Sequence, residues 1–271
     1  IGRLMSRTGL DLVSARMFGP SQELAEQYAA MLRQDPDIEP FMRDVLADYV
    51  LRCYAPDPVT RRRRRVLMLL FEGVDAIRKI REVTGPITRN METGETIRDS
   101  YGDFIVWEQG DIRHIEPAIF IGPTRREVEQ TLKLWLAYSE SDGGIIGEAL
   151  DVPNGADIQK TLVIIKPDNF RFPSARPGTI IDLFSRSGLR MIAAKMHRMS
   201  VAEAEEFYGP VRDVLRQKLR SIVAERACRA LGEELSMEIP DSLKEQMGAM
   251  LGPIYGDNQF YQIVQFMTGC W

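Results

Sequence analysis

The sequence predicts an α+β fold of two ferredoxin-like (βαββαβ) units, in which helices cover antiparallel sheets. Two observations lead to this prediction: the chain repeats itself, and each copy alternates helix and strand patterns. Ile1–Leu10 and Ile180–Leu189 are identical at six of ten positions, so residue n matches residue n + 179. The similarity continues from Asp11–Met17 to Arg190–Met196. This period is too long for a solenoid and indicates a tandem duplication.

Local signals predict two elements of the first copy. Val66–Phe71 is a short apolar run that follows Arg61–Arg65, and it predicts a strand buried on both faces. Thr124-Arg-Arg-Glu127 is a capping box, in which the threonine and the glutamate each bond the other's backbone N–H. It predicts the start of an amphipathic helix that runs through Leu136.

The second copy shows the same alternation. Thr161–Ile165 predicts a strand that ends in a Lys-Pro-Asp turn. Ile180–Ser187 has the apolar spacing of a helix, with Gly188 placed as a left-handed cap after its end. Met191–Met199 is expected to form the next strand, and Ser200-Val-Ala-Glu203 is a capping box that opens the following helix.

The two copies are expected to occupy residues 1–142 and 160–271, with 143–159 as a linker rich in Ser, Asp, Gly, Pro and Asn. The first copy lacks its first strand, and the second lacks its later part. Two explanations stay open. Either the sequence is trimmed at both ends, or strands are exchanged between copies or between chains.

The composition is that of a globular protein, with 44% apolar and 27% charged residues. The net charge of −4 argues against a generally basic nucleic-acid binder. Three widely spaced cysteines argue against a disulfide scaffold or structural zinc and favour a reducing, cytoplasmic location. No apolar run is long enough to span a membrane, so no membrane partner is expected.

Several motifs occur in the order found in one enzyme family. Thr161-Leu-Val-Ile-Ile-Lys-Pro-Asp168 resembles the first strand and the Lys-Pro-Asp signature of the nucleoside diphosphate kinase family. Val66-Leu-Met-Leu-Leu-Phe-Glu-Gly73 resembles its third strand with the trailing Glu-Gly. Gly85-Pro-Ile-Thr88, Glu95-Thr-Ile-Arg98 and Leu134-Trp135 resemble three further family motifs.

This resemblance implies transfer of a γ-phosphoryl group between nucleoside tri- and diphosphates through a phosphohistidine, with Mg²⁺ on the phosphates. It also implies a homo-oligomer. The nucleotide- and phosphate-binding positions implied by the family are Lys166 and Tyr208 in the second copy and Tyr28, Arg81, Thr88 and Arg98 in the first.

The histidine nucleophile is missing from its place in the first copy. Alignment back from Leu134-Trp135 puts Phe120 at the histidine position, and a phenylalanine cannot accept a phosphoryl group. His114 precedes it within an insertion of about residues 103–115. Two interpretations stay open for His114: a nucleophile in a slipped alignment, or a surface histidine on an extended hairpin. His197 lies in a predicted strand and is expected to be structural.

The leading hypothesis is therefore a tandem nucleoside diphosphate kinase-like protein whose first copy is catalytically degenerate. The alternative is a non-catalytic nucleotide-binding, assembly or regulatory pseudokinase. Arg61–Arg65 has the charge to bind nucleic acid, but it lacks interleaved aromatic residues. We expect it to be a solvated loop before a buried strand, and nucleic acid is not an expected partner.

Overall fold

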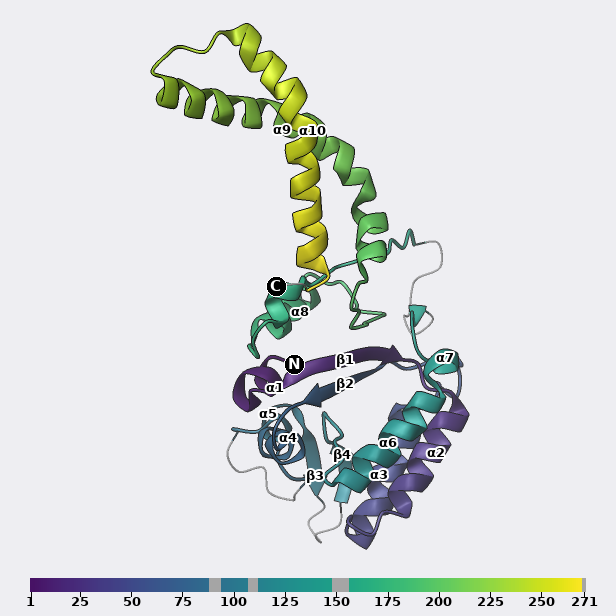
Figure 1. Cartoon of the computed structure of the whole chain (residues 1–271). Coiled ribbons are helices and arrows are strands. Elements are labelled where there is room, and N and C mark those ends of the chain that lie inside the picture. Colours follow the sequence, from purple (N-terminus) through teal and green to yellow (C-terminus); the bar gives the residue numbers. More distant parts are fainter. Residues whose placement is uncertain (88–93, 107–111, 148–155, 270–271) are drawn as a thin grey trace. The chain divides into compact units, whose positions relative to one another are not determined.

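The computed structural model describes residues 1–87, 94–106, 112–147 and 156–269, in two compact units, Ile1–Met196 and His197–Trp271. The protein is α+β, with helices and small antiparallel sheets (Figure 1). The elements of the first unit are α1 (Gly2–Thr8), β1 (Asp11–Phe18), α2 (Gln22–Arg33), α3 (Pro40–Cys53), β2 (Val66–Glu72), α4 (Ala76–Thr84), α5 (Ile97–Tyr101), β3 (Asp103–Val106), β4 (Ile112–Glu116), α6 (Arg125–Ala137), α7 (Ser139–Asp142), the 3-10 turn η2 (Pro167–Phe170) and α8 (Arg176–Arg186).

The strand predicted at Val66–Phe71 is confirmed as β2. It pairs antiparallel with β1, from Asp11 opposite Glu72 to Phe18 opposite Val66. The prediction that its residues are buried on both faces was wrong, since Val66–Phe71 are all half-buried. Among the described residues β2 has β1 as its one neighbouring strand, so the apolar side chains of β2 stay partly accessible.

The main core lies among α2, α3 and α6, which Figure 1 shows side by side. The capping box predicted at Thr124 and Glu127 is confirmed and starts α6. Ser21 caps α2, because its side chain accepts a hydrogen bond from the Leu24 N–H. The buried residues of this core are Phe18, Leu24, Tyr28, Ala29, Leu32, Met42, Leu46, Ala47, Val50, Ile115 and Trp135.

Two strands predicted for the second copy are not formed. Thr161–Ile165 belongs to no strand, and its Leu162 is 78% exposed. Met191–Met199 makes a single isolated bridge, between Lys195 and Arg16. An extended segment becomes a strand only where a neighbour takes its ladder hydrogen bonds, and apolar content alone does not provide one. The helix predicted over residues 180–187 is confirmed as α8, and Gly188 follows it with φ 83°.

The second unit is a helical hairpin of α9 (Val201–Leu235) and α10 (Asp241–Met267). The predicted capping box at Ser200 and Glu203 is confirmed and starts α9. The described residues of this unit contain no strand, so the expected second ferredoxin-like sheet is not formed in this part of the chain. The compact units also divide the chain elsewhere than the predicted copies do, since the predicted linker falls within the first unit. No helix in the described ranges is long and apolar enough to cross a membrane.

Three glycines let α9 and α10 approach closely. Gly248, Gly252 and Gly256 recur every fourth residue of α10, and all three are buried. A Cβ on Gly256 would lie 2.6 Å from the Cα of Arg216, a backbone atom of α9 that cannot move away by rotamer change. Asp257 then fixes the register, because its carboxylate binds Arg212 at 2.9 Å and Arg216 at 2.7 Å.

We predict that Gly256→Ala destabilises the hairpin. Helix propensity alone would make the alanine variant more stable by about 1 kcal/mol. A net loss of unfolding free energy would therefore show that the steric cost of the alanine Cβ exceeds this gain. The overpacking cost is about 1–3 kcal/mol. Urea unfolding followed by circular dichroism measures the difference. Ala249→Gly, at an exposed position of the same helix, calibrates the propensity term. A net stabilisation by Gly256→Ala would contradict the packing described here.

Candidate functional site

Phe120, which the resemblance puts at the histidine position, packs against the expected site tyrosine, Tyr28. The Phe120 and Tyr28 ring centroids lie 6.1 Å apart, edge to face. Tyr28 also meets Trp135 edge to face at 5.7 Å and stacks on Tyr54 at 6.0 Å. Phe120 contacts Tyr49 at 5.7 Å. An aromatic cluster therefore fills the place where the resemblance puts the nucleophile.

Arg98 lies beside this cluster and is buried. It comes from α5, which Thr96 caps by accepting a hydrogen bond from the Asp99 N–H. Its Nη1 donates to the carbonyl of Gly85 at 2.5 Å, and its Nη2 donates to the carbonyl of Ile119 at 3.0 Å. Ile119 directly precedes Phe120, so these hydrogen bonds tie the end of α4 to the loop that carries the phenylalanine.

The electrostatics of Tyr28 and Arg98 follow from their burial. Burial lowers the pKa of the Arg98 guanidinium to about 10, which still leaves it charged at neutral pH. Burial, followed by the nearby Glu127 carboxylate, raises the pKa of the Tyr28 hydroxyl well above its usual value, and Arg98 opposes this shift in part. At neutral pH the site thus holds a cation and a neutral phenol.

The other expected site residues lie on other elements or outside the described ranges. Arg81 is exposed on α4. Lys166 is exposed at the start of η2, and Tyr208 is half-buried on α9, in the other unit. His114 lies on β4, opposite Ile105 of β3, within a hairpin. Thr88 lies outside the described residues.

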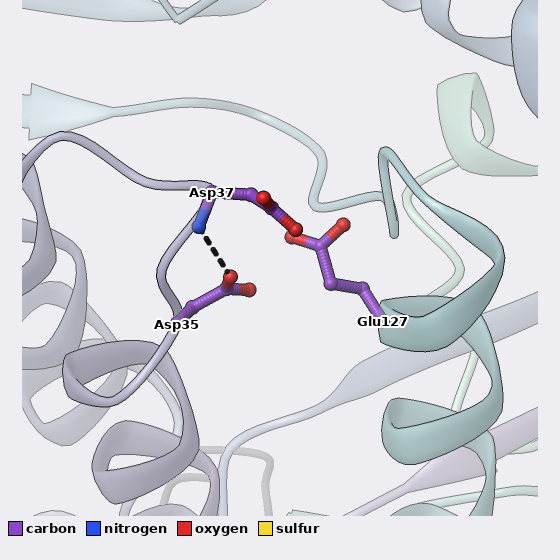
Figure 2. A group of neighbouring side chains, drawn as sticks. All are labelled: Asp35, Asp37 and Glu127. Carbon is purple, nitrogen blue, oxygen red and sulfur yellow. Dashed lines mark hydrogen bonds between the residues drawn. The ribbon is translucent and has the colours of Figure 1, made fainter.

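Three acidic residues gather near the start of α6, and sequence analysis missed this cluster. Figure 2 shows Asp35, Asp37 and Glu127, with the carboxylates of Asp37 and Glu127 turned toward each other. Glu127 is 5% exposed and accepts hydrogen bonds from the Thr124 N–H at 2.8 Å and the Thr124 hydroxyl at 2.5 Å. The capping box signalled the position of Glu127, but no sequence signal placed Asp35 beside it.

This cluster does not fit Mg²⁺, the metal that the family resemblance implies. Burial, together with the hydrogen bond to Asp35, raises the pKa of Glu127 to about 7, so the Glu127 carboxyl gives up its proton less readily than an ordinary glutamate. Arg126 Nη2 lies 3.4 Å from Asp35 and 3.0 Å from Asp37 and offsets their charge. A hard divalent cation prefers ionised carboxylates without a competing guanidinium.

The arginines of the run at Arg61–Arg65 bind the protein itself. Arg63 donates to the carbonyls of Gly19 and Ser141, and Arg64 donates to the carbonyl of Ala55. Arg65 donates to the carbonyl of Met191 at 2.5 Å. Arg62–Arg65 line an open cavity of about 600 Å³. The run is thus held by backbone carbonyls at Arg63, Arg64 and Arg65, and this part of it is not the solvated loop that the sequence predicted.

Comparison with known proteins finds similarity over part of the chain. Residues 159–219 match the family model "Nucleoside diphosphate kinase". A nucleoside diphosphate kinase of Chlamydia trachomatis is 51% identical over 51 residues, which is 19% of this chain and 35% of the relative. One from Francisella tularensis is 49% identical over 55 residues, which is 20% of this chain and 38% of the relative. The chain thus spans about a third of the length of these relatives.

The resemblance to the nucleoside diphosphate kinase family is confirmed over these residues. The matched segment includes Lys166 and Tyr208, whereas Tyr28, Arg81 and Arg98 lie outside it.

We predict that Glu127 makes folding pH-dependent. The folded protein holds a proton that the unfolded chain, with an ordinary pKa of 4.5, has already released. The free energy of unfolding therefore falls as the pH rises from about 4.5 to about 7 and then levels off. Glu127→Gln keeps an acceptor for Thr124 and removes this titration, so its stability should fall less over the same range.

Urea unfolding at several pH values measures this difference. Glu129→Gln, at an exposed position of the same helix, should retain the pH dependence of the unmodified protein. If the unfolding free energy of Glu127→Gln changed with pH as steeply as that of the unmodified protein, Glu127 would not be the group responsible.

Proposed function

We propose that the chain is a nucleoside diphosphate kinase-like protein with tandem copies, in which the second copy binds a nucleoside di- or triphosphate and the first is catalytically degenerate. The packing of Phe120 on Tyr28, beside a buried and hydrogen-bonded Arg98, carries the proposal for the first copy. The family match that includes Lys166 and Tyr208 supports the proposal for the second.

The chemistry explains why the first copy would be inactive. In the phosphohistidine reaction an imidazole nitrogen lone pair forms an N–P bond while the bond from the γ-phosphorus to the bridging oxygen breaks and the diphosphate leaves. Phe120 has no lone pair to offer. The Arg98 nitrogens that would meet phosphate oxygens donate instead to the carbonyls of Gly85 and Ile119. Phe120 and Arg98 therefore contribute to the packing of the first copy and not to phosphoryl transfer.

The second copy keeps a cation suited to a phosphate. Asn169 donates from its backbone N–H at 3.1 Å and from its Nδ2 at 3.2 Å to the Lys166 carbonyl, which fixes the turn. The Lys166 side chain is exposed at the start of this turn. An ammonium group in that position acts as a point charge for a nucleotide phosphate. Mg²⁺ would come with the phosphates, since the acidic cluster does not fit it.

The first copy would then have an assembly role rather than a catalytic one. Its aromatic cluster and its α2–α3–α6 core contribute apolar packing. A catalytic role for His114 stays a prediction, because the structure describes only its backbone pairing, opposite Ile105 of β3.

We predict that ADP with Mg²⁺ raises the melting temperature of the full chain, because a ligand that binds only the folded state stabilises it. Lys166→Ala should weaken ADP binding about tenfold or more, since a hydrogen bond to a charged group contributes about 1.5–3 kcal/mol. Lys160→Ala removes an exposed lysine of the same segment and serves as the matched control.

The measurement is a thermal-shift titration of all three proteins up to millimolar ADP. Absence of a shift in the unmodified chain would contradict nucleotide binding. An equal loss of ADP affinity in Lys166→Ala and Lys160→Ala would contradict the role of Lys166.

A further inference from the structure

The open cavity beside the arginine run is strongly cationic. Four consecutive arginines, Arg62–Arg65, line it, and the one carboxylate among its described lining residues is that of Asp57. Guanidinium groups keep their charge at any physiological pH, so this excess of positive charge cannot be relieved by loss of a proton. Like charges on the wall of one cavity repel each other, and a bound anion removes that repulsion.

The turn that carries these arginines is fixed by its own hydrogen bonds. The Asp57 carboxylate accepts from the backbone N–H of Val59 at 3.0 Å and of Thr60 at 2.8 Å. The Asp57 N–H donates to the Arg62 carbonyl at 2.9 Å, and the Arg61 N–H donates to the Asp57 carbonyl at 2.8 Å. The backbone is therefore ordered before any ligand binds, which lowers the entropy cost of binding.

Three of the arginines are each held by one part of the guanidinium group. Arg63 and Arg65 donate from Nη1, and Arg64 donates from Nε, to backbone carbonyls. A guanidinium group has five N–H donors. Apart from Arg64 Nη2, which lies 3.6 Å from Asp57, the remaining donors of these three residues meet no acceptor in the described part of the chain. Arg63 and Arg64 are half-buried and Arg65 is exposed, so these donors are accessible to a ligand.

This arrangement suits a chain of linked phosphate groups. A guanidinium group binds phosphate oxygens through two parallel N–H···O bonds, which a lysine cannot do. One phosphate can meet only one or two such groups, whereas four of them around about 600 Å³ can meet several phosphates at once. The described lining contains no aromatic side chain on which a base could stack. The phosphates, and not a base, would therefore be the part of the ligand that is recognised.

We propose that the cavity lined by Arg62–Arg65 binds an oligophosphate, a chain of two or more linked phosphate groups. Inorganic triphosphate and the triphosphate of a nucleotide share this chemistry. Lys166 is not among the described residues that line the cavity, so this site is separate from the nucleotide site proposed above. The proposal does not rest on nucleotide binding by the second copy.

The test is calorimetric titration of the full chain with inorganic triphosphate, without Mg²⁺. Arg65→Gln should weaken binding about tenfold or more, the effect of losing a hydrogen bond between charged groups. Arg61→Gln is the matched control, because it removes the same charge from the same run but from a residue that does not line the cavity. It should bind triphosphate nearly as tightly as the unmodified chain. An equal loss of affinity in both variants would show general charge attraction and would overturn the proposal.

Lys166→Ala separates this site from the proposed nucleotide site. It should keep the triphosphate binding of the arginine cavity, and complete loss of binding in this variant would overturn the proposal. In the same variant, ATP that binds as tightly as inorganic triphosphate would support recognition of the phosphates alone, and tighter binding of ATP would identify a nucleotide as the source of the oligophosphate. Orthophosphate that binds as tightly as triphosphate would overturn the match to linked phosphates. Single-stranded DNA that binds more tightly than triphosphate, and through Arg65, would replace the proposal with a nucleic-acid site.

Chemical modification of the unmodified chain keeps the test independent of how well Arg65→Gln folds, since Arg65 also binds the Met191 carbonyl. Phenylglyoxal reacts with accessible arginines, and mass spectrometry locates the modified residues. Inorganic triphosphate should protect Arg65 at least tenfold more than Arg61. Equal reactivity of Arg65 with and without triphosphate would overturn the proposal. Neither measurement uses ADP, so a failure here and a failure of ADP binding are separate results.

Discussion

A buried guanidinium group is costly unless its N–H groups find acceptors, and this constraint organises the site of the first copy. Arg98 meets it in part: Nη1 and Nη2 donate to the carbonyls of Gly85 and Ile119, while the buried Nε has no hydrogen-bond partner among the described residues. Those two carbonyls belong to the end of α4 and to the loop that carries Phe120, so satisfying Arg98 also places the Phe120 ring against Tyr28. A cation that could meet a phosphate instead holds an aromatic core together. The degenerate residue at the histidine position and the bonding of Arg98 therefore support the same conclusion.

β1 has a comparable role in the backbone of the first unit. An unpaired strand edge leaves N–H and C=O groups without partners and invites association with another chain. One edge of β1 bonds β2, and the other receives residues 194–196 of the repeat. Residues 194–196 thus give this edge a partner within the chain. Arg65 strengthens this connection. It is the last residue of the arginine run that precedes β2, and it donates a hydrogen bond to the Met191 carbonyl.

Local patterns predicted the elements that depend on local hydrogen bonds. The capping boxes at Thr124 and Ser200, the helix that ends before Gly188 and the strand at Val66–Phe71 are all confirmed. Thr161–Ile165 failed as a strand because strand formation requires a neighbour that its own residues do not specify. The structure brings Tyr28, Arg98 and Phe120 close together, and their correspondence to the family's site residues stays a prediction. The contact of Glu127 with Asp35 depends on how α6 packs beside the loop after α2, which no single segment encodes.

We propose that residues 1–142 have kept the aromatic and arginine positions of a phosphotransferase site for packing and not for chemistry. The most direct test is to incubate the full chain with Mg²⁺ and ATP labelled on the γ-phosphate and to map the label on peptides at neutral pH, where phosphohistidine survives. The account predicts no labelled peptide from residues 1–142. A label on His114 would contradict it, because it would show that a nucleophile outside the aligned position restores the reaction.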